Sequence, residues 1–327
     1  MNVSPASADS LRAALAGLLD GLPPQRATQA VERLIANYRG TTPTDAPVLR
    51  DRSDVAAYAA YRMPATFEAV RGALRALRAA APDWEPRTHT DVGGGTGAAS
   101  WAVAEAWGER PPRTTVLDWA EPALALGREL AAGTLDAEWR TARIGGALRL
   151  ADTDLVTVSY VLKELTPADR TALVAEAARA AGTVVVVEPG TPDGYERIIA
   201  ARTLLVDAGF TVAAPCPHSG TCPIEPGADW CHFAARVSRS SLHRKVKGGS
   251  LPYEDEKYAY VAATRLPVTP AASRITRRPQ IRKGLVQFDL CGPDGLARET
   301  VTKRHGPLYK QARDAEWGDA WPPEETA

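Results

Sequence analysis

Cysteine is scarce in this sequence of 327 residues, and its four cysteines all lie after residue 215. Three are close together, at Cys216, Cys222 and Cys231, and the fourth is Cys291. Small secreted domains that depend on disulfides have a higher density of cysteines. A small, clustered set of thiols indicates a metal or iron–sulfur site rather than a disulfide framework.

Signals for secretion and membrane insertion are also lacking. The first ten residues are polar, without the basic start and apolar run of a signal peptide. No stretch comes near the ~18 uncharged apolar residues that a membrane helix needs. We therefore expect a cytoplasmic protein without membrane contact, and at about 150 residues per domain we expect two domains after a helical segment.

The formal net charge is zero, yet positive charge is concentrated in one segment. Between Arg236 and Lys283, twelve lysines and arginines stand against three acidic residues. This density suits contact with the phosphate backbone of RNA, although a charged run is usually only a solvated face. One run follows Cys231 and the other precedes Cys291, so we expect them to meet on one surface. The candidate RNA-binding residues are Arg236, Arg239, Arg244, Lys245, Lys247, Arg277, Arg278, Arg282 and Lys283.

Apolar patterning divides the chain into three regions, 1–82, 83–214 and 215–327. The first has helical spacing, and the third is rich in proline and glycine before it becomes basic and strand-like. The second alternates short apolar runs with alanine-rich helical stretches, which predicts a doubly wound α/β sheet of βαβ units. Expected strands are 88–92, 114–117, 155–159, 182–187 and 210–212, and expected helices are 98–107, 121–131, 167–180 and 194–208. In the third region we expect strands at 257–265 and 282–290, a return strand at 299–303 that completes a hairpin, and a helix at 307–317.

The most informative motif is the glycine-rich loop Asp91-Val92-Gly93-Gly94-Gly95-Thr96-Gly97, between an expected strand and an expected helix. Glycines at 93, 95 and 97 let the backbone turn tightly and approach a ligand, and the next helix presents free amide groups. Asp118 ends the following strand, where an acidic residue commonly accepts hydrogen bonds from ribose hydroxyls. The third glycine at 97 and an acidic residue at 91 favour S-adenosylmethionine, with Asp91 binding its amino end through the loop.

Two alternatives remain for this loop. The register Gly93-x-Gly95-x-x-Ala98 is the dinucleotide fingerprint, so an NAD(P)-dependent enzyme is a rival. Glycines used only for close packing of helix and strand are the other alternative. Further strand ends at the same edge would line the pocket with Ser159 and Tyr160, and Glu188 is expected either as a ligand contact or as a helix cap.

The cysteine spacing is Cys-x5-Cys-x8-Cys, followed by a long gap. Zinc sites usually use tight Cys-x2–4-Cys pairs, which this chain lacks, whereas iron–sulfur clusters accept more open spacing. His218 and His232 lie beside the thiols and keep zinc open as an alternative. The remaining alternatives are buried free cysteines and a nucleophilic cysteine after Pro215.

Six motifs are spread along nearly the whole chain. They are Tyr61-Arg62-Met63-Pro64-Ala65-Thr66, 91–97, Val161-Leu162-Lys163-Glu164-Leu165, Glu188-Pro189-Gly190-Thr191-Pro192, 216–231 and Leu251-Pro252-Tyr253-Glu254-Asp255-Glu256-Lys257. Together they resemble the methyltransferase-like small-ribosomal-subunit assembly factors of mitochondria and bacteria. The resemblance implies a class I methyltransferase-like fold, a [4Fe–4S] cluster on Cys216, Cys222, Cys231 and Cys291, and binding to small-subunit ribosomal RNA.

The expected activity is methylation of ribosomal RNA with S-adenosylmethionine as donor. The chain lacks the Asn/Asp-Pro-Pro-Tyr/Phe motif of amino-methylating enzymes, so catalytic residues are not assigned. A non-catalytic RNA-binding assembly factor with a structural zinc or iron–sulfur site is the alternative. We expect the free protein to be a monomer that binds the small ribosomal subunit.

Overall fold

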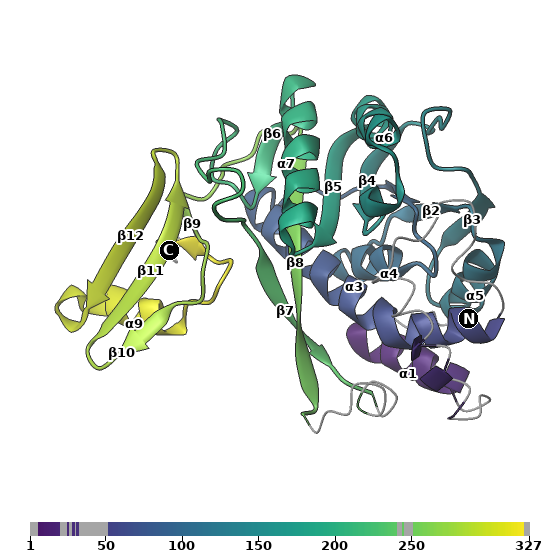
Figure 1. The fold of residues 1–327 in the computed structure, drawn as a ribbon, viewed down its shortest axis with the longest axis horizontal. Helices are drawn as coiled ribbons and strands as arrows, with labels where there is room; N and C mark the ends of the chain where they lie inside the picture. Colours follow the sequence, from purple (N-terminus) through teal and green to yellow (C-terminus); the bar gives the residue numbers. More distant parts are fainter. Residues whose placement is uncertain are drawn as a thin grey trace.

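The computed structural model describes residues 6–19, 25, 28–29, 31–32, 52–240, 244 and 251–323. Two layers of helices enclose one large sheet, and a smaller sheet lies beside it (Figure 1). Lys245 and Lys247, two of the predicted RNA-binding residues, lie outside the described residues.

The large sheet has the strand order β3-β2-β1-β4-β5-β8-β6, with β7 also paired to β8. β1 to β5 are parallel to one another, whereas β8 is antiparallel to β5, β6 and β7. This arrangement confirms the predicted doubly wound, class I methyltransferase-like fold. The bounds are β1 (Thr88–Val92), β2 (Arg113–Asp118), β3 (Ala137–Thr141), β4 (Thr153–Ser159), β5 (Ala181–Pro189), β6 (Thr211–Ala214), β7 (Phe233–Ser238) and β8 (Tyr253–Thr264).

Helices cover both faces of this sheet. α1 (Ala8–Leu19), α3 (Arg52–Ala80), α4 (Ala98–Ala106) and α5 (Glu121–Ala131) pack on one face, and α6 (Pro167–Ala180) and α7 (Pro192–Asp207) pack on the other. The central strand β5 has Val185 and Val187 in one core and Val184 and Val186 in the other. Alternating side chains point to opposite faces of a strand, so the run of valines is buried on both sides, as expected for a central strand.

The smaller sheet has the order β10-β11-β9-β13, with β12 paired to β11. The predicted hairpin is confirmed, because β11 and β12 pair from Leu285↔Thr302 to Gly292↔Gly295. The last helix, α9, ends three residues before the expected end. The bounds are β9 (Ser273–Ile275), β10 (Gln280–Arg282), β11 (Leu285–Gly292), β12 (Gly295–Thr302), α9 (Pro307–Asp314) and β13 (Ala320–Trp321).

The division that we expected at residue 215 does not coincide with a division between the sheets. β7 and β8 follow that position, yet both belong to the large sheet. Tyr258 of β8 pairs with Pro189 of β5 on one edge and with Phe233 of β7 on the other, so β7 continues the edge that β6 begins. Residues 215–232 therefore leave the sheet at the end of β6 and return to the same edge at β7.

Candidate functional site

The glycine-rich loop joins β1 to α4 at the carboxyl edge of the sheet. Gly93, Gly95 and Gly97 have φ values of 69°, 53° and 85°, in the left-handed region that favours glycine. A Cβ atom at Gly93 would lie 2.2 Å from Val161 Cγ2, and one at Gly97 would lie 2.6 Å from the ring of Trp139. Packing therefore accounts for those two glycines, whereas a Cβ at Gly95 would meet only Asp118 Oδ2, at 3.7 Å. Gly95 is the position of the loop that faces open space.

Asp118 ends β2 next to this opening. Its Oδ2 accepts a hydrogen bond from the Gly95 amide at 2.9 Å, and its Oδ1 accepts one from the Ala120 amide at 2.9 Å. Burial raises the pKa of the Asp118 carboxyl, and the backbone hydrogen bonds oppose that rise. The backbone of Trp119 also hydrogen-bonds the carboxylate, so three of its four lone pairs are used and one remains for a ligand hydroxyl. The exposed ring of Trp119, which our sequence analysis missed, directly follows.

The side chain of Asp91, which we predicted to bind a ligand ammonium group through the loop, does not face this opening. The side chain is fully buried. Its oxygens accept hydrogen bonds from Ser100 Oγ at 2.8 Å and Thr157 Oγ1 at 2.9 Å. Burial raises the Asp91 pKa to about 6. Asp91 therefore ties β1 to β4 and α4 behind the loop.

His89 extends this buried network. Its Nε2 lies 2.8 Å from Thr157 Oγ1, which already donates its proton to Asp91. Nε2 is therefore the protonated nitrogen, and Nδ1, which lies 3.1 Å from Thr114 Oγ1, is the acceptor nitrogen. Burial lowers the His89 pKa to about 3, so the ring is neutral.

Ser159 and Tyr160 differ in their availability. Ser159 Oγ is buried and has no hydrogen-bond partner among the described residues. Tyr160 has a φ of 61°, and its hydroxyl donates to Glu256 Oε1 at 3.0 Å. Glu256 also pairs with Arg62 at 2.9 Å. Thus Ser159 retains a free polar group at the edge of the sheet, whereas the Tyr160 hydroxyl is bound by β8.

Glu188 does not contact this opening. It is fully buried, its Oε2 pairs with Arg197 Nε at 2.6 Å, and its Oε1 accepts from the Leu162 amide at 3.0 Å. Its role is structural, and a buried pair of this kind needs both partners.

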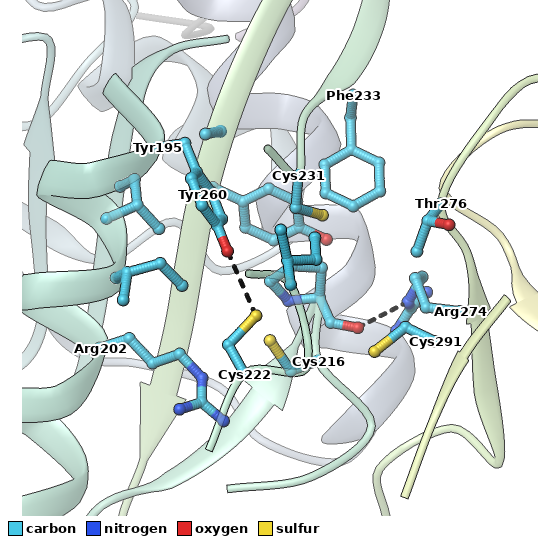
Figure 2. Close-up of a pocket in the computed structure, with 15 residues that line it drawn as sticks. Tyr195, Arg202, Cys216, Cys222, Cys231, Phe233, Tyr260, Arg274, Thr276 and Cys291 are labelled. Atoms are coloured by element: carbon cyan, nitrogen blue, oxygen red, sulfur yellow. Dashed lines mark hydrogen bonds between the residues drawn. The ribbon is translucent and has the colours of Figure 1, made fainter. Parts of the chain in front are cut away.

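The four cysteines line one pocket, which Figure 2 shows between α7, the loop 215–232 and the smaller sheet. Cys216, Cys222 and Cys231 come from the loop, and Cys291 comes from β11. The pocket has about 510 Å³ of space, part of it open to solvent. Residues 60 or more positions apart in the chain thus meet at the junction of the two sheets.

Burial favours the protonated form of three of the four thiols. Burial raises the pKa of Cys216 and Cys231, and it raises the pKa of Cys291 to about 12. Tyr195 Oη lies 3.2 Å from Cys222 Sγ. Arg202 and Arg274, which the sequence analysis did not single out, also line the pocket.

The thiols do not have the geometry of a single-ion site. Within the described ranges, no group of three or more His, Cys, Asp or Glu side chains is arranged to hold one metal ion. His218 Nε2 lies 3.9 Å from Cys291 Sγ, whereas His232 stacks on Trp230, with ring centroids 5.4 Å apart.

The predicted basic residues do not form one surface of free charge. Arg236 of β7 and Arg239, which directly follows β7, pair with Asp255 and Glu254 of β8, each at 3.2 Å. Arg277 pairs with Asp229 of the cysteine loop. The exposed residues are Arg236, Arg244, Arg278, Arg282 and Lys283. The last three lie on or beside β10, on the smaller sheet.

The strand order and the glycine-rich loop define a methyltransferase-like α/β protein to which a four-thiol pocket is added. The chain belongs to the family described as mitochondrial small ribosomal subunit Rsm22, whose model matches residues 52–322. This confirms the resemblance drawn from the motifs.

Two relatives illustrate the extent of the match. The human mitochondrial ribosome assembly protein METTL17 is 31% identical over 290 residues, which cover 81% of this chain and 62% of that protein. The mitochondrial Rsm22-cox11 tandem protein 2 of Schizosaccharomyces pombe is 28% identical over 184 residues, covering 43% of this chain and 24% of that protein. The chain thus spans less than two thirds of the length of either relative.

Solved structures share the fold more distantly. Magnesium protoporphyrin IX methyltransferase from Synechocystis, with S-adenosylmethionine bound, has a TM-score of 0.40 and 16% identity, covering 62% of this chain and 80% of that one. A TehB-like methyltransferase from Corynebacterium glutamicum has a TM-score of 0.38 and 11% identity, covering 75% and 100%.

The prediction of a cytoplasmic protein is wrong by these comparisons. The family description and the names of both relatives are mitochondrial. No helix of the described residues is long and apolar enough to cross a membrane.

Proposed function

We propose that this protein is an assembly factor of the small ribosomal subunit that binds S-adenosylmethionine and holds a [4Fe–4S] cluster. The family and the name of the human relative support the assembly role. The single observation that carries the proposal is the meeting of all four cysteines in one pocket between the two sheets. Loss of the cluster would then separate the sheets and abolish the docking surface.

The pocket fits a cluster better than zinc. A tetrahedral zinc ion needs its sulfur ligands at about 2.3 Å, and so needs them close together. The described thiols are not grouped for one ion, although all four face the same space. Cysteine is the usual ligand of a polynuclear iron–sulfur cluster, which spans a wider gap. When bound, the cluster supplies iron–thiolate bonds that cross-link the loop 215–232 to β11.

The carboxyl edge of the large sheet fits S-adenosylmethionine. Asp118 retains acceptor capacity for ribose hydroxyls, Gly95 leaves the loop open, and Ser159 Oγ is buried without a partner. The dinucleotide rival fits the topology less well, because the usual Rossmann sheet has the parallel order 3-2-1-4-5-6. Here the antiparallel β8 lies between β5 and β6.

RNA docking is proposed for the smaller sheet. Arg278, Arg282 and Lys283 are exposed and form no ion pair with another described residue. Such residues neutralise phosphates without displacing a partner carboxylate. Arg236, Arg239 and Arg277 contribute less, since each already pairs with a carboxylate.

Binding to immature small subunits tests the proposal. We expect Cys222→Ser to lose particle binding, because the cluster assembles the docking surface. Asp118→Ala should still bind particles but lose the thermal stabilisation by S-adenosylmethionine, which is about 2.7 kcal/mol at 100 times the dissociation constant. Ile224→Val, in the pocket wall, is the matched control. Particle binding that persists in Cys222→Ser contradicts the role of the cluster, and stabilisation by NAD alone contradicts the choice of cofactor.

Methyl transfer is tested separately with labelled S-adenosylmethionine and the same particles. We expect label in the ribosomal RNA of immature subunits and none with Asp118→Ala. No incorporation into any precursor would contradict the enzymatic part of the proposal and leave the docking function.

A further inference from the structure

Two positive charges are buried in the thiol pocket without a carboxylate. Of the arginines that the structure describes, only Arg202 and Arg274 are buried, with 5% and 7% of their surface exposed. Arg202 Nη2 donates to the carbonyls of His218 and Gly220 at 2.8 and 2.7 Å. Arg274 donates to the carbonyls of Pro215 and Gly318 at 2.9 and 3.0 Å. Main-chain carbonyls orient a guanidinium but do not cancel its charge.

Other enclosed arginines of the described residues form ion pairs with carboxylates. Arg197 pairs with Glu188 at 2.6 Å, and Arg239 pairs with Glu254 at 3.2 Å. A buried charge without a counter-charge is strongly destabilising. The pocket therefore has two positive charges that no carboxylate balances.

The thiols are the groups that can balance these charges. Cys216 and Cys291 line the same pocket as Arg202 and Arg274. Arg202 Nε is buried and has no hydrogen-bond partner among the described residues, although the side chain lines the pocket (Figure 2). Arg274 also pairs across the sheet with Cys291.

We infer that Arg202 and Arg274 are positioning residues that compensate the charge of the cluster, with Arg202 Nε–H as a donor to one of its sulfurs. A [4Fe–4S] core with two positive charges, held by four thiolates, carries two negative charges, which two guanidinium groups match. Each arginine also holds the backbone of the loop or strand that carries the cysteines. This inference rests on the proposed cluster.

The charges of Arg202 and Arg274 should also affect the midpoint potential of the cluster. Reduction adds one electron and so one negative charge to the cluster, and nearby cations stabilise the reduced form. Net charge and hydrogen bonds to sulfur set the potential of such clusters. Removing Arg202 therefore moves the midpoint potential to a more negative value, while a purely structural change does not.

The test uses the full chain purified without oxygen, with the midpoint potential and the rate of iron release to a chelator as readouts. Arg202→Met should shift the potential to a more negative value and release iron several-fold faster than the unmodified chain. Arg202→Lys keeps the charge and should restore most of the potential. Arg265→Met is the matched control, because Arg265 also donates to main-chain carbonyls but does not line the pocket.

Equal potentials and equal release rates in Arg202→Met and Arg265→Met would overturn the inference. If the cluster is not reducible, the release rates alone decide between these outcomes. Failure of the underlying proposal is distinguishable, because the unmodified chain would then contain no iron and no sulfide.

Discussion

The two candidate sites of this protein contrast in how their polar groups are satisfied. Behind the glycine-rich loop of the large sheet, the buried acid Asp91 and the neutral His89 are satisfied by hydroxyl groups of the protein itself. In the thiol pocket, Arg202 and Arg274 have no carboxylate, and burial raises thiol pKa values. The network behind the loop is thus complete without a ligand, whereas the two arginines of the thiol pocket lack a counter-charge.

The largest effect should come from breaking the thiol pocket. In the proposed cluster site, Cys291 is the ligand that the smaller sheet contributes. Cys291→Ser should therefore detach that sheet and cost about 5 kcal/mol or more, given the usual contribution of structural metal sites. Denaturant unfolding, together with trypsin cleavage in the linker 265–272, measures this. Ile224→Val should cost only about 1 kcal/mol. Equal stability of Cys291→Ser and Ile224→Val would contradict the proposal that the cluster cross-links the loop 215–232 to β11.

Glycine substitutions separate packing from binding at the other site. Gly93→Ala should cost about 3 kcal/mol, because a positive φ and a clash with Val161 add together. Gly95→Ala should cost about 1 kcal/mol, from its positive φ alone, while it weakens S-adenosylmethionine binding. Thermal unfolding with and without the ligand measures both. The distinction fails if Gly95→Ala keeps full ligand stabilisation.

The buried network predicts a dependence of stability on pH. The folded pKa of His89, about 3, is below the unfolded value of 6.5, so stability is lost as pH falls below 6.5. The folded pKa of Asp91, about 6, is above the unfolded 3.8, so stability is gained as pH falls from 6 to 3.8. Between pH 6 and pH 3.8, the contributions of His89 and Asp91 to the free energy of unfolding therefore cancel.

Asp91→Asn removes the gain in stability that comes from Asp91 and leaves the loss that comes from His89. Between pH 6 and pH 4 this variant should lose about 3 kcal/mol more than the unmodified chain, at about 1.36 kcal/mol per pH unit. Urea unfolding across this range measures it, with Asp83→Asn, at an exposed carboxylate, as the control. Parallel pH profiles for the two variants would show that Asp91 is ionised in the fold.

The smallest effects concern RNA. Arg282→Ala with Lys283→Ala should reduce the slope of log affinity against log salt by about 2, one for each lost phosphate contact. Arg236→Ala should change the slope little, because that residue is paired with Asp255. Titration with small-subunit RNA at several salt concentrations tells them apart. Equal slopes for the double variant and for Arg236→Ala would indicate that RNA also binds at β7 and not only at the smaller sheet.

The fold was largely predictable where the pattern is local. β1 and α5 have the predicted bounds, and the glycine-rich loop lies between strand and helix as expected. β3 was missed because it is a polar, mostly exposed edge strand, and β7 was missed because its pairing depends on β8, a separate segment of the chain. The same limit applies to Asp91, whose role depends on Thr157 and Ser100, and to Arg202, whose relation to the thiols exists only after folding.

The comparison between the two sites is tested most directly by the metal content of the chain purified without oxygen. The account predicts about four iron and four sulfide per chain, with both lost in Cys222→Ser and retained in Gly95→Ala. One zinc per chain without sulfide, or a folded chain with no metal, would contradict it.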